Sequence, residues 1–208
     1  MRGRLILIEG LDRSGKSTQA EILANRLNGQ LFKFPDRSTP IGEIINKFLT
    51  DPTFELSDES VHLLFSANRW EKAAQLNKLL SEGTHVIMDR YVYSGIAYSL
   101  AKDKSRDVEW LYGPDVGLPK PDLTFFLTVS MEELGTRKGW GEERYEKEQF
   151  QLKVKECFLK VLRVDTDPTI EIVDVNGLSI DETTLKLWSI IEARGLEGVT
   201  DDSLKTLA

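Results

Sequence analysis

Residues 10–17 read Gly10-Leu11-Asp12-Arg13-Ser14-Gly15-Lys16-Ser17, which satisfies the pattern G-x-x-x-x-G-K-S/T at every fixed position. Glycine lets the backbone wrap closely round phosphate oxygens, and a helix that begins there favours an anion at its N-terminus. The alternative is an ordinary glycine turn. Here an apolar run precedes the motif and a helical pattern follows it, which is the context that a phosphate-binding loop (P-loop) requires.

Several side chains in and beside this loop are candidates for nucleotide binding. We expect Lys16 to reach the β- and γ-phosphates of ATP and the Ser17 hydroxyl to ligate Mg²⁺. Arg13 lies inside the loop, where a cation would face the transferred phosphoryl group, although a solvated arginine at a loop tip is the alternative. The predicted nucleotide contacts in this segment are Gly10, Arg13, Ser14, Gly15, Lys16, Ser17 and Thr18.

Outside the loop, short apolar runs alternate with helical patterns. The runs predict strands at 4–9, 30–34, 85–89, 122–129 and 169–173. Helices are predicted at 18–27, 39–49, 57–81, 91–102, 107–112, 131–162 (with a break at Gly139 and Gly141) and 180–194. Because this alternation produces parallel strands covered on both faces, it predicts an α/β P-loop NTPase fold with a five-stranded parallel sheet flanked by helices.

Length and composition set further limits. The 208 residues suit one domain, 1–208, and the weak pattern of 195–208 favours a mobile tail. The net charge of −7 argues against a general nucleic-acid surface. No apolar run approaches the roughly 18 residues of a membrane span, and the run behind Met1 is too short for a signal peptide. A single cysteine, Cys157, suits a reducing compartment, so we expect the cytoplasm, the nucleus or both.

Two arginines suggest a second phosphate site. Arg37 and Arg90 follow the predicted strands 30–34 and 85–89, and ligands of parallel α/β sheets bind beyond the carboxyl ends of the strands. Two planar guanidinium forks beside a P-loop indicate an acceptor that itself carries a phosphate, although structural salt bridges are the alternative. Asp89 ends its strand as the metal-side aspartate of P-loop enzymes does, and its alternative role is a helix cap.

Two further segments are candidates for substrate contact. Phe65 and Arg69 are four residues apart and share a helix face, so a ring and a guanidinium could together hold a planar base; the alternatives are core packing and a salt bridge. The segment at about 135–147 is charged and contains two glycines. It could form a short lid that closes and excludes water, or it could be an exposed turn.

In order along the chain, these segments resemble the thymidylate kinase family. The resemblance runs from Leu5 to about Arg194 and rests on the stretches 10–18, 34–37, 64–69, 89–95, 114–122 and 143–146. It implies transfer of the γ-phosphoryl group of ATP to dTMP, giving ADP and dTDP, with Mg²⁺. The position of Arg13 further resembles the eukaryotic branch, which carries its catalytic arginine in the P-loop. The family also implies a homodimer.

The resemblance assigns contacts on the acceptor phosphate and sugar. Asp12 would meet the deoxyribose 3′-hydroxyl, and Arg37 and Arg90 would hold the phosphate. Tyr98 would crowd the sugar 2′ position and so reject a ribonucleotide. Arg13, Lys16, Arg90 and Asp89 make up the predicted catalytic set, with Ser17 and Asp89 on the metal.

The resemblance also assigns contacts on the base, the lid and the donor. Phe65 would stack on thymine and Arg69 would bond its carbonyl edge, with Gly95 also among the substrate-binding residues. Tyr145 would close on the substrate from the lid. Arg137 would lie against the adenine of ATP.

Three other functions remain to be compared. A deoxynucleoside kinase would have little use for Arg37 and Arg90, because its acceptor carries no phosphate. A GTP-dependent switch protein would need a guanine-reading Asn-Lys-x-Asp segment, and none occurs. A regulatory ATP-binding module without turnover would not need the intact Arg13, Lys16, Ser17 and Asp89.

Overall fold

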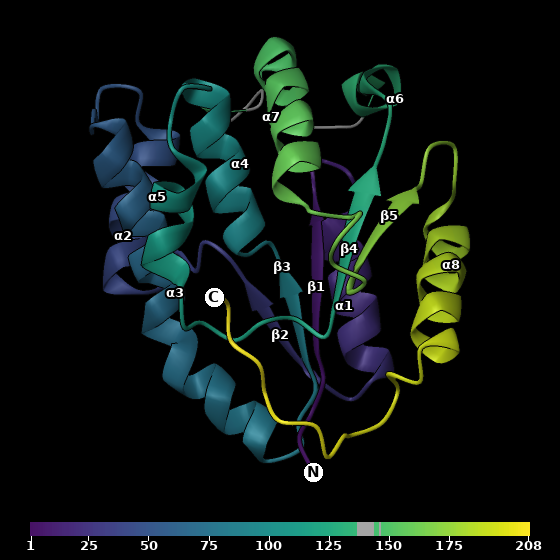
Figure 1. Cartoon of the computed structure of the whole chain (residues 1–208). Coiled ribbons are helices and arrows are strands. Elements are labelled where there is room, and N and C mark those ends of the chain that lie inside the picture. The colour runs from purple at the N-terminus through teal and green to yellow at the C-terminus, as the bar shows by residue number, and fades with distance from the viewer. Residues whose placement is uncertain (137–143, 146) are drawn as a thin grey trace.

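A computed structural model describes residues 1–136, 144–145 and 147–208, and among these residues it forms one parallel sheet of five strands (Figure 1). The order across the sheet is β2-β3-β1-β4-β5. The strands are β1 (Leu5–Gly10), β2 (Gln30–Lys33), β3 (Val86–Asp89), β4 (Leu123–Thr128) and β5 (Ile170–Asp174). The predicted α/β fold and its five strands are confirmed, with bounds that differ by at most one residue at each end.

Burial explains which runs became central strands. Every residue of β1 and β3 is buried, because both strands lie inside the sheet with helices on each face. Only Phe32 is buried in β2, which is an edge strand. An apolar run without polar alternation therefore marks the strands covered on both sides.

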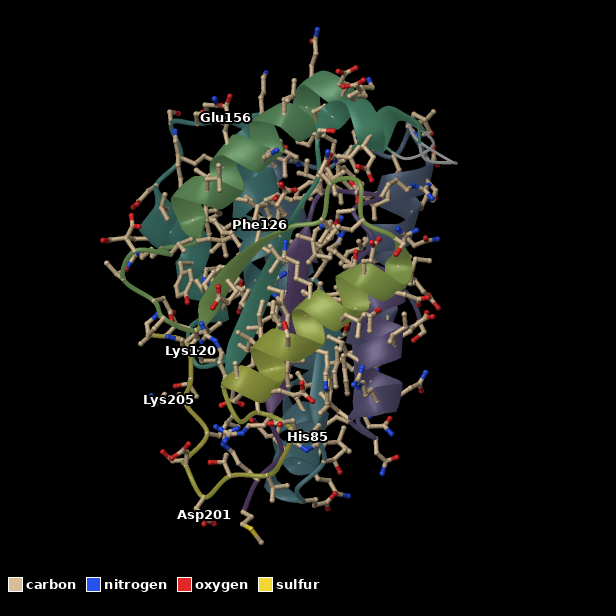
Figure 2. All side chains as sticks on the ribbon, turned by 90° about the vertical axis from the view of Figure 1, so that its right-hand side faces the viewer. His85, Lys120, Phe126, Glu156, Asp201 and Lys205 are labelled. Atoms are coloured by element: carbon tan, nitrogen blue, oxygen red, sulfur yellow. The ribbon has the colours of Figure 1, made fainter. Side chains whose placement is uncertain are left out.

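Helices cover both faces of the sheet. They are α1 (Lys16–Arg26), α2 (Pro40–Thr50), α3 (Asp58–Ser81), α4 (Val92–Lys102), α5 (Val108–Tyr112), α6 (Met131–Thr136), α7 (Glu148–Val161) and α8 (Ile180–Ala193), with a short 3₁₀ helix, η1, at Gly113–Asp115. Helix α1 packs against α8, whereas α4 packs against α3 and α7. Figure 2, turned by 90°, shows the sheet between α7 on one side and α1 on the other. The described part of the chain contains no helix long and apolar enough to cross a membrane.

The segment predicted as one helix at 131–162 consists of α6 and α7 in the structure. The stretch between them includes residues 137–143 and 146, which lie outside the described residues. The predicted break at Gly139 and Gly141 therefore also lies outside them. On the C-terminal side of the break, α7 ends at Val161, one residue before the predicted end.

The tail, residues 195–208, runs back across the molecule. It forms isolated bridges between Thr200 and Arg2 and between Thr206 and Pro119. Near its end, Leu207 is buried and exchanges backbone hydrogen bonds with Gly117 and Leu118 at 2.9 and 2.8 Å. A weak pattern favoured a mobile tail, and it did not indicate these contacts because they involve isolated residues rather than a helix or strand.

The sheet brings three loops to one edge. All arrowheads in Figure 1 point the same way, and β3 lies between β2 and β1. The segments after β1, β2 and β3 begin the P-loop, the Arg37 loop and the Arg90 turn. Since these strands are neighbours, the predicted site residues that follow them must lie side by side.

Candidate active site

A cavity of about 710 Å³ opens at the carboxyl edge of the sheet. The predicted site residues that line it are Asp12, Arg13, Ser14, Gly15, Lys16, Ser17, Thr18, Arg37, Phe65, Arg69, Asp89, Arg90, Gly95, Tyr98 and Tyr145. Gly10 is not among the lining residues, and Arg137 lies outside the described residues. Donor-side and acceptor-side candidates therefore face one shared space.

Two glycines let the P-loop make its turn. Gly15 has φ of 95°, a left-handed conformation that glycine adopts without steric cost. At Gly10 a Cβ would lie 2.8 Å from the carbonyl oxygen of Leu127, so a side chain there would push the loop off β4. Gly10 thus allows close packing of the P-loop on β4, although it does not itself line the cavity. Arg13, with φ of 64°, is exposed at the cavity and projects from the loop.

The Lys16 side chain folds back onto the backbone of the P-loop. Its ammonium group is buried and donates to the Leu11 carbonyl oxygen at 2.5 Å and to Ser14 Oγ at 3.5 Å. Burial and the nearby Arg90 lower the pKa of Lys16 to about 8, although Asp89 and Asp12 oppose the shift. An anionic ligand beside Lys16 would therefore favour its protonated form.

Ser17 and Asp89 lie together as two possible ligands of a metal ion whose other ligands would be phosphate oxygens. Ser17 Oγ donates to Asp89 Oδ2 at 2.5 Å, and Lys33 Nζ lies 3.7 Å from the same carboxylate oxygen. Asp89 Oδ1 is buried and accepts no hydrogen bond from the described residues. Those residues contain no group of three or more His, Cys, Asp or Glu that could hold a metal. One hydroxyl and one carboxylate suit Mg²⁺, which is usually held by few protein ligands together with substrate phosphates.

Arg90 links the P-loop to the other half of the cavity. It forms an ion pair with Asp12, and its Nη1 donates to Ser94 Oγ at 3.0 Å and to the Gly10 carbonyl oxygen at 3.3 Å. Burial works against ionisation of Asp12, but Arg90 and Lys16 outweigh it and hold the pKa of Asp12 below its usual value. The pair is therefore charged at neutral pH and fixes Arg90 at the junction of the two halves.

Gln151 is a site residue that no sequence motif indicated; it lies in α7 and is fully buried. Its amide nitrogen donates to Asp12 Oδ2 at 2.7 Å and to the Tyr145 carbonyl oxygen at 2.8 Å. Tyr98 donates to the same Asp12 oxygen at 2.8 Å. Gln151 therefore connects the P-loop aspartate with the end of the predicted lid.

The Arg37 loop is held in place by Asn68 of α3. Asn68 is fully buried, accepts from the Asp36 amide at 2.8 Å and donates to the Asp36 carbonyl oxygen at 3.0 Å. The Arg37 guanidinium, which lines the cavity, donates to Asn46 Oδ1 at 3.0 Å. Arg37 therefore enters the cavity from a loop fixed at its base.

The opposite end of the cavity is built by α3 and α4. Phe65 lines the cavity and packs against a small apolar cluster that includes Phe48 and Val61. Arg69 is buried, and its Nε and Nη2 bind Asp115 at 2.9 and 2.6 Å. The salt bridge weighed as an alternative for Arg69 is thus present, while the residue also lines the cavity. A Cβ on Gly95 would lie 3.0 Å from Arg69 Nη1, so glycine leaves room for the guanidinium.

His62 is a further lining residue, for which the sequence indicated no role in the site. Its Nε2 lies 2.8 Å from the Leu111 carbonyl oxygen, so this nitrogen carries the proton and Nδ1 accepts from Ser99 Oγ at 2.9 Å. Burial lowers the pKa of His62. A neutral His62 therefore supports the wall between α3 and α4.

Only part of the predicted lid at 135–147 is described. Tyr145 stacks on Phe150 with ring centroids 5.3 Å apart and meets the Tyr98 ring at 5.7 Å. Arg144 donates to the carbonyl oxygens of Asp51 and Phe54 at 3.0 and 3.3 Å. The end of the lid thus rests on the acceptor side of the cavity.

On the P-loop side, five lining residues come from the turn after β5 and from the start of α8. They are Val175, Leu178, Ser179, Ile180 and Thr183. Gln19 of α1 ties this segment to the P-loop helix by donating to the Ile180 carbonyl oxygen at 3.0 Å. The sequence marked this stretch only as a helix start, because apolar residues in a turn form no motif. It adds a partly apolar slot beside the P-loop.

Comparisons with known proteins identify relatives over most of this chain. The family model described as thymidylate kinase matches residues 8–184. A thymidylate kinase of Dictyostelium discoideum is 44% identical over 198 residues, which is 92% of this chain and 86% of the relative. The human thymidylate kinase is 41% identical over 195 residues, covering 86% of this chain and 91% of the relative.

Solved structures give the same result. A thymidylate kinase from Candida albicans superposes with a TM-score of 0.96 at 55% identity, covering 100% of this chain and 99% of the other. The residues matched by the family model include the P-loop and the arginines after β2 and β3. This chain belongs to the thymidylate kinase family.

Proposed function

We propose that this chain transfers the γ-phosphoryl group of ATP to dTMP, giving ADP and dTDP, with Mg²⁺ and through the residues described above. The observation that carries the proposal is the single cavity lined by both the P-loop and two arginines from other strand ends, Arg37 and Arg90. An enzyme that joins two phosphate-bearing substrates needs cations on both sides of the transferred group. Family membership supports the same reaction.

The donor would bind along the P-loop. Lys16 would contact the β- and γ-phosphates, and Arg13 would offset charge on the transferred group. Ser17 and Asp89 would hold Mg²⁺, which supplies charge neutralisation on the phosphate oxygens. The slot formed by Val175, Leu178, Ser179, Ile180 and Thr183 would take the adenine, together with Arg137, which lies outside the described residues.

The acceptor phosphate would lie between Arg37 and Arg90. Its oxygen is already anionic near neutral pH, so the transfer needs no strong general base. Catalysis is then positioning and electrostatic stabilisation by Arg13, Lys16 and Arg90. In-line geometry would be set by Arg90, because it bonds the P-loop carbonyl of Gly10 and faces the acceptor.

The sugar and base would occupy the α3–α4 end. Asp12 would accept from the 3′-hydroxyl, and the Tyr98 ring would leave no room for a 2′-hydroxyl. Phe65 would stack on thymine. Arg69 is held by Asp115 through Nε and Nη2, and Nη1, beside Gly95, is then directed at a base carbonyl. Tyr145 would cover the bound nucleotide.

We also propose that the protein is a homodimer, on the basis of an apolar surface. Leu63 and Trp70 of α3 share a helix face and are 45% and 43% exposed. Trp110 packs on His62, the residue before Leu63, with ring centroids 5.4 Å apart, and is 42% exposed. Large exposed apolar side chains gathered in this way are typical of an interface. Light scattering of the pure protein should give twice the mass of the chain.

The remaining proposals concern setting and organisation. The packing of all described elements round one sheet supports a single domain, 1–208, with a lid at about 135–147. The net charge of −7 supports small nucleotides rather than nucleic acid as ligands. A lone buried cysteine fits the reducing cytoplasm or nucleus.

The test of the proposed reaction is a coupled ADP-release assay with Mg·ATP. Acceptors to compare are dTMP, dUMP, dGMP and thymidine; the purine is included because the Candida albicans thymidylate kinase is described as having broad substrate specificity. We expect turnover with dTMP, less with dUMP and little with thymidine. Turnover with thymidine but not dTMP would mean that Arg37 and Arg90 are structural and that the chain is a nucleoside kinase.

A further inference from the structure

Glu9 is a buried carboxylate to which neither the sequence motifs nor the reaction above gives a role. It lies in β1, directly before Gly10, and its exposed fraction is 0%. Oε1 accepts from the backbone amides of Tyr91 and Ser94 at 2.9 and 3.0 Å. Oε2 accepts from Ser94 Oγ at 2.5 Å. Among the described residues, these hydrogen bonds come from the turn and helix that follow Arg90.

The hydrogen bond between Glu9 and Ser94 determines how the Ser94 hydroxyl is oriented toward Arg90. A serine hydroxyl has one proton and two lone pairs. Because Glu9 Oε2 accepts that proton, the lone pairs of Ser94 Oγ are left for Arg90 Nη1, which donates to it at 3.0 Å. Glu9, Ser94 and Arg90 thus form a chain in which each bond orients the next. The chain ends at the cation that pairs with Asp12.

Glu9 also fixes the backbone on which Arg90 is mounted. Arg90 has φ of 69°, a left-handed conformation that is unfavourable for a residue other than glycine and so needs support from its neighbours. The Arg90 amide donates to the Ile8 carbonyl oxygen at 3.0 Å, and the next amide, of Tyr91, donates to Glu9. The two peptide groups round Arg90 are therefore both held by β1, one of them through the Glu9 carboxylate.

Stabilisation of the start of α4 does not by itself explain why residue 9 is a charged glutamate. Burial raises the pKa of Glu9, whereas Arg90 and the bonds from Ser94 and Tyr91 oppose the shift. A buried carboxylate is costly unless paired, and a neutral amide could accept the same two backbone bonds at the start of α4. A carboxylate accepts the hydroxyl proton of Ser94 more strongly than a neutral amide does. The lone pairs of Ser94 Oγ are then free to accept from Arg90.

We propose that Glu9 is a positioning residue for phosphoryl transfer. Through Ser94 and through the Arg90–Tyr91 backbone, it holds the Arg90 guanidinium at the point where the P-loop meets the acceptor phosphate. This inference rests on the proposed function in one respect, namely that Arg90 contacts the acceptor. Glu9 itself touches neither substrate.

Four variants test the proposal by steady-state kinetics. Glu9→Gln keeps the shape and removes the charge, and Ser94→Ala removes the relay while Ser94→Thr keeps its hydroxyl. Thr124→Val is the matched control, since Thr124 is equally buried in β4 and its hydroxyl has no hydrogen-bond partner in the described residues. Because a displacement of the order of 1 Å can cost about 10²-fold in rate, we expect a loss of about 10- to 100-fold in kcat/KM for dTMP in Glu9→Gln and Ser94→Ala.

Four further readouts separate positioning from stability. The KM for ATP should stay within about threefold, and Ser94→Thr should recover most of the activity, because it restores the acceptor for Arg90. The double variant Glu9→Gln/Ser94→Ala should lose little more than either single one, since the two side chains act in one chain of bonds. The Tm of Glu9→Gln at pH 8 should not fall, because the substitution removes a buried charge whose pKa is raised.

Activity of Glu9→Gln within threefold of the parent would overturn the proposal, as would equal losses for ATP and dTMP that track a fall in Tm. If the parent itself does not phosphorylate dTMP, the proposed function fails separately. Crystal structures of the parent and of Glu9→Gln then decide. The inference requires the Arg90 guanidinium to shift by about 1 Å relative to Asp12 and the Gly10 carbonyl in the variant, and an unmoved Arg90 would refute it.

Discussion

The donor side and the acceptor side of the cavity are built in different ways. On the donor side, one continuous stretch from Gly10 to Ser17 supplies the loop, the lysine and the hydroxyl. On the acceptor side, Asp12, Arg90 and Gln151 meet from three separate elements, and Gln151 is 139 positions from Asp12. A loop of backbone amides can be recognised from its glycines, whereas a network of side chains exists only after the sheet and helices have assembled.

Arg90→Ala should produce the largest effect, because Arg90 belongs to both sides. It bonds the Gly10 carbonyl oxygen of the donor loop and pairs with the Asp12 carboxylate. Removing it leaves the half-buried Asp12 carboxylate without its cation and removes a positive charge beside the acceptor phosphate. We expect kcat/KM for dTMP to fall by about 10³-fold in steady-state assays.

The control for this prediction is Arg106→Ala. Arg106 forms ion pairs only with exposed carboxylates in the described residues, among them Asp58 and Glu59. Kinetic constants of that variant should match the parent. An Arg90→Ala enzyme with comparable activity would assign Arg90 to structure alone.

Arg13→Ala tests the donor side by itself. Arginines that face the transferred phosphoryl group contribute about 10³–10⁵ in kcat, so we expect a loss of at least about 10² in kcat. The KM for dTMP should change little, because Arg13 belongs to the donor loop. A kcat within threefold of the parent would show that Arg13 is a solvated loop-tip residue.

Phe65→Ala tests the far end of the acceptor side. Stacking of a base on an aromatic ring contributes about 1–3 kcal/mol, which predicts a rise of about 10-fold or more in the KM for dTMP. The KM for ATP should stay the same. Phe65→Tyr keeps the ring and serves as the control, and an unchanged KM in Phe65→Ala would return Phe65 to the apolar core.

Gln151→Leu tests the link that the sequence did not reveal. The substitution removes the amide that joins Asp12 to the Tyr145 carbonyl, and loss of hydrogen bonds to a buried charge costs about 1–3 kcal/mol. We expect the KM for dTMP to rise about five- to tenfold, with the KM for ATP unchanged. Equal effects on both substrates would place Gln151 in the general stability of α7.

The smallest expected effect is a proton taken up when ATP binds. Burial and the nearby Arg90 lower the pKa of Lys16 to about 8, so roughly half of the molecules carry a neutral Lys16 at pH 8 before ATP is added. Phosphates beside it raise that pKa again, so binding at pH 8 should take up about 0.5 proton and affinity should weaken as the pH rises further. Calorimetry in two buffers of different ionisation enthalpy measures the uptake, and Lys16→Arg, which stays charged, should show none.

Prediction from the sequence succeeded where the signal is local. The five apolar runs located the strands, and the glycine motif located a loop that lines the cavity, because each signal depends on neighbouring residues. The arginines Arg37 and Arg90 could be placed together because strand ends of a parallel sheet share one edge. Asp115, which holds Arg69, and Gln151 could not be found, because their roles come from contacts across the fold. The same holds for the slot between β5 and α8.

The central claim is that donor and acceptor phosphates share one cavity. The direct test is calorimetric binding of a molecule that joins adenosine and thymidine through five phosphates. We predict one molecule per chain, binding more tightly than ATP or dTMP alone, and loss of binding of both substrates once it is bound. Competition with ATP alone, with dTMP still binding normally, would contradict the shared cavity.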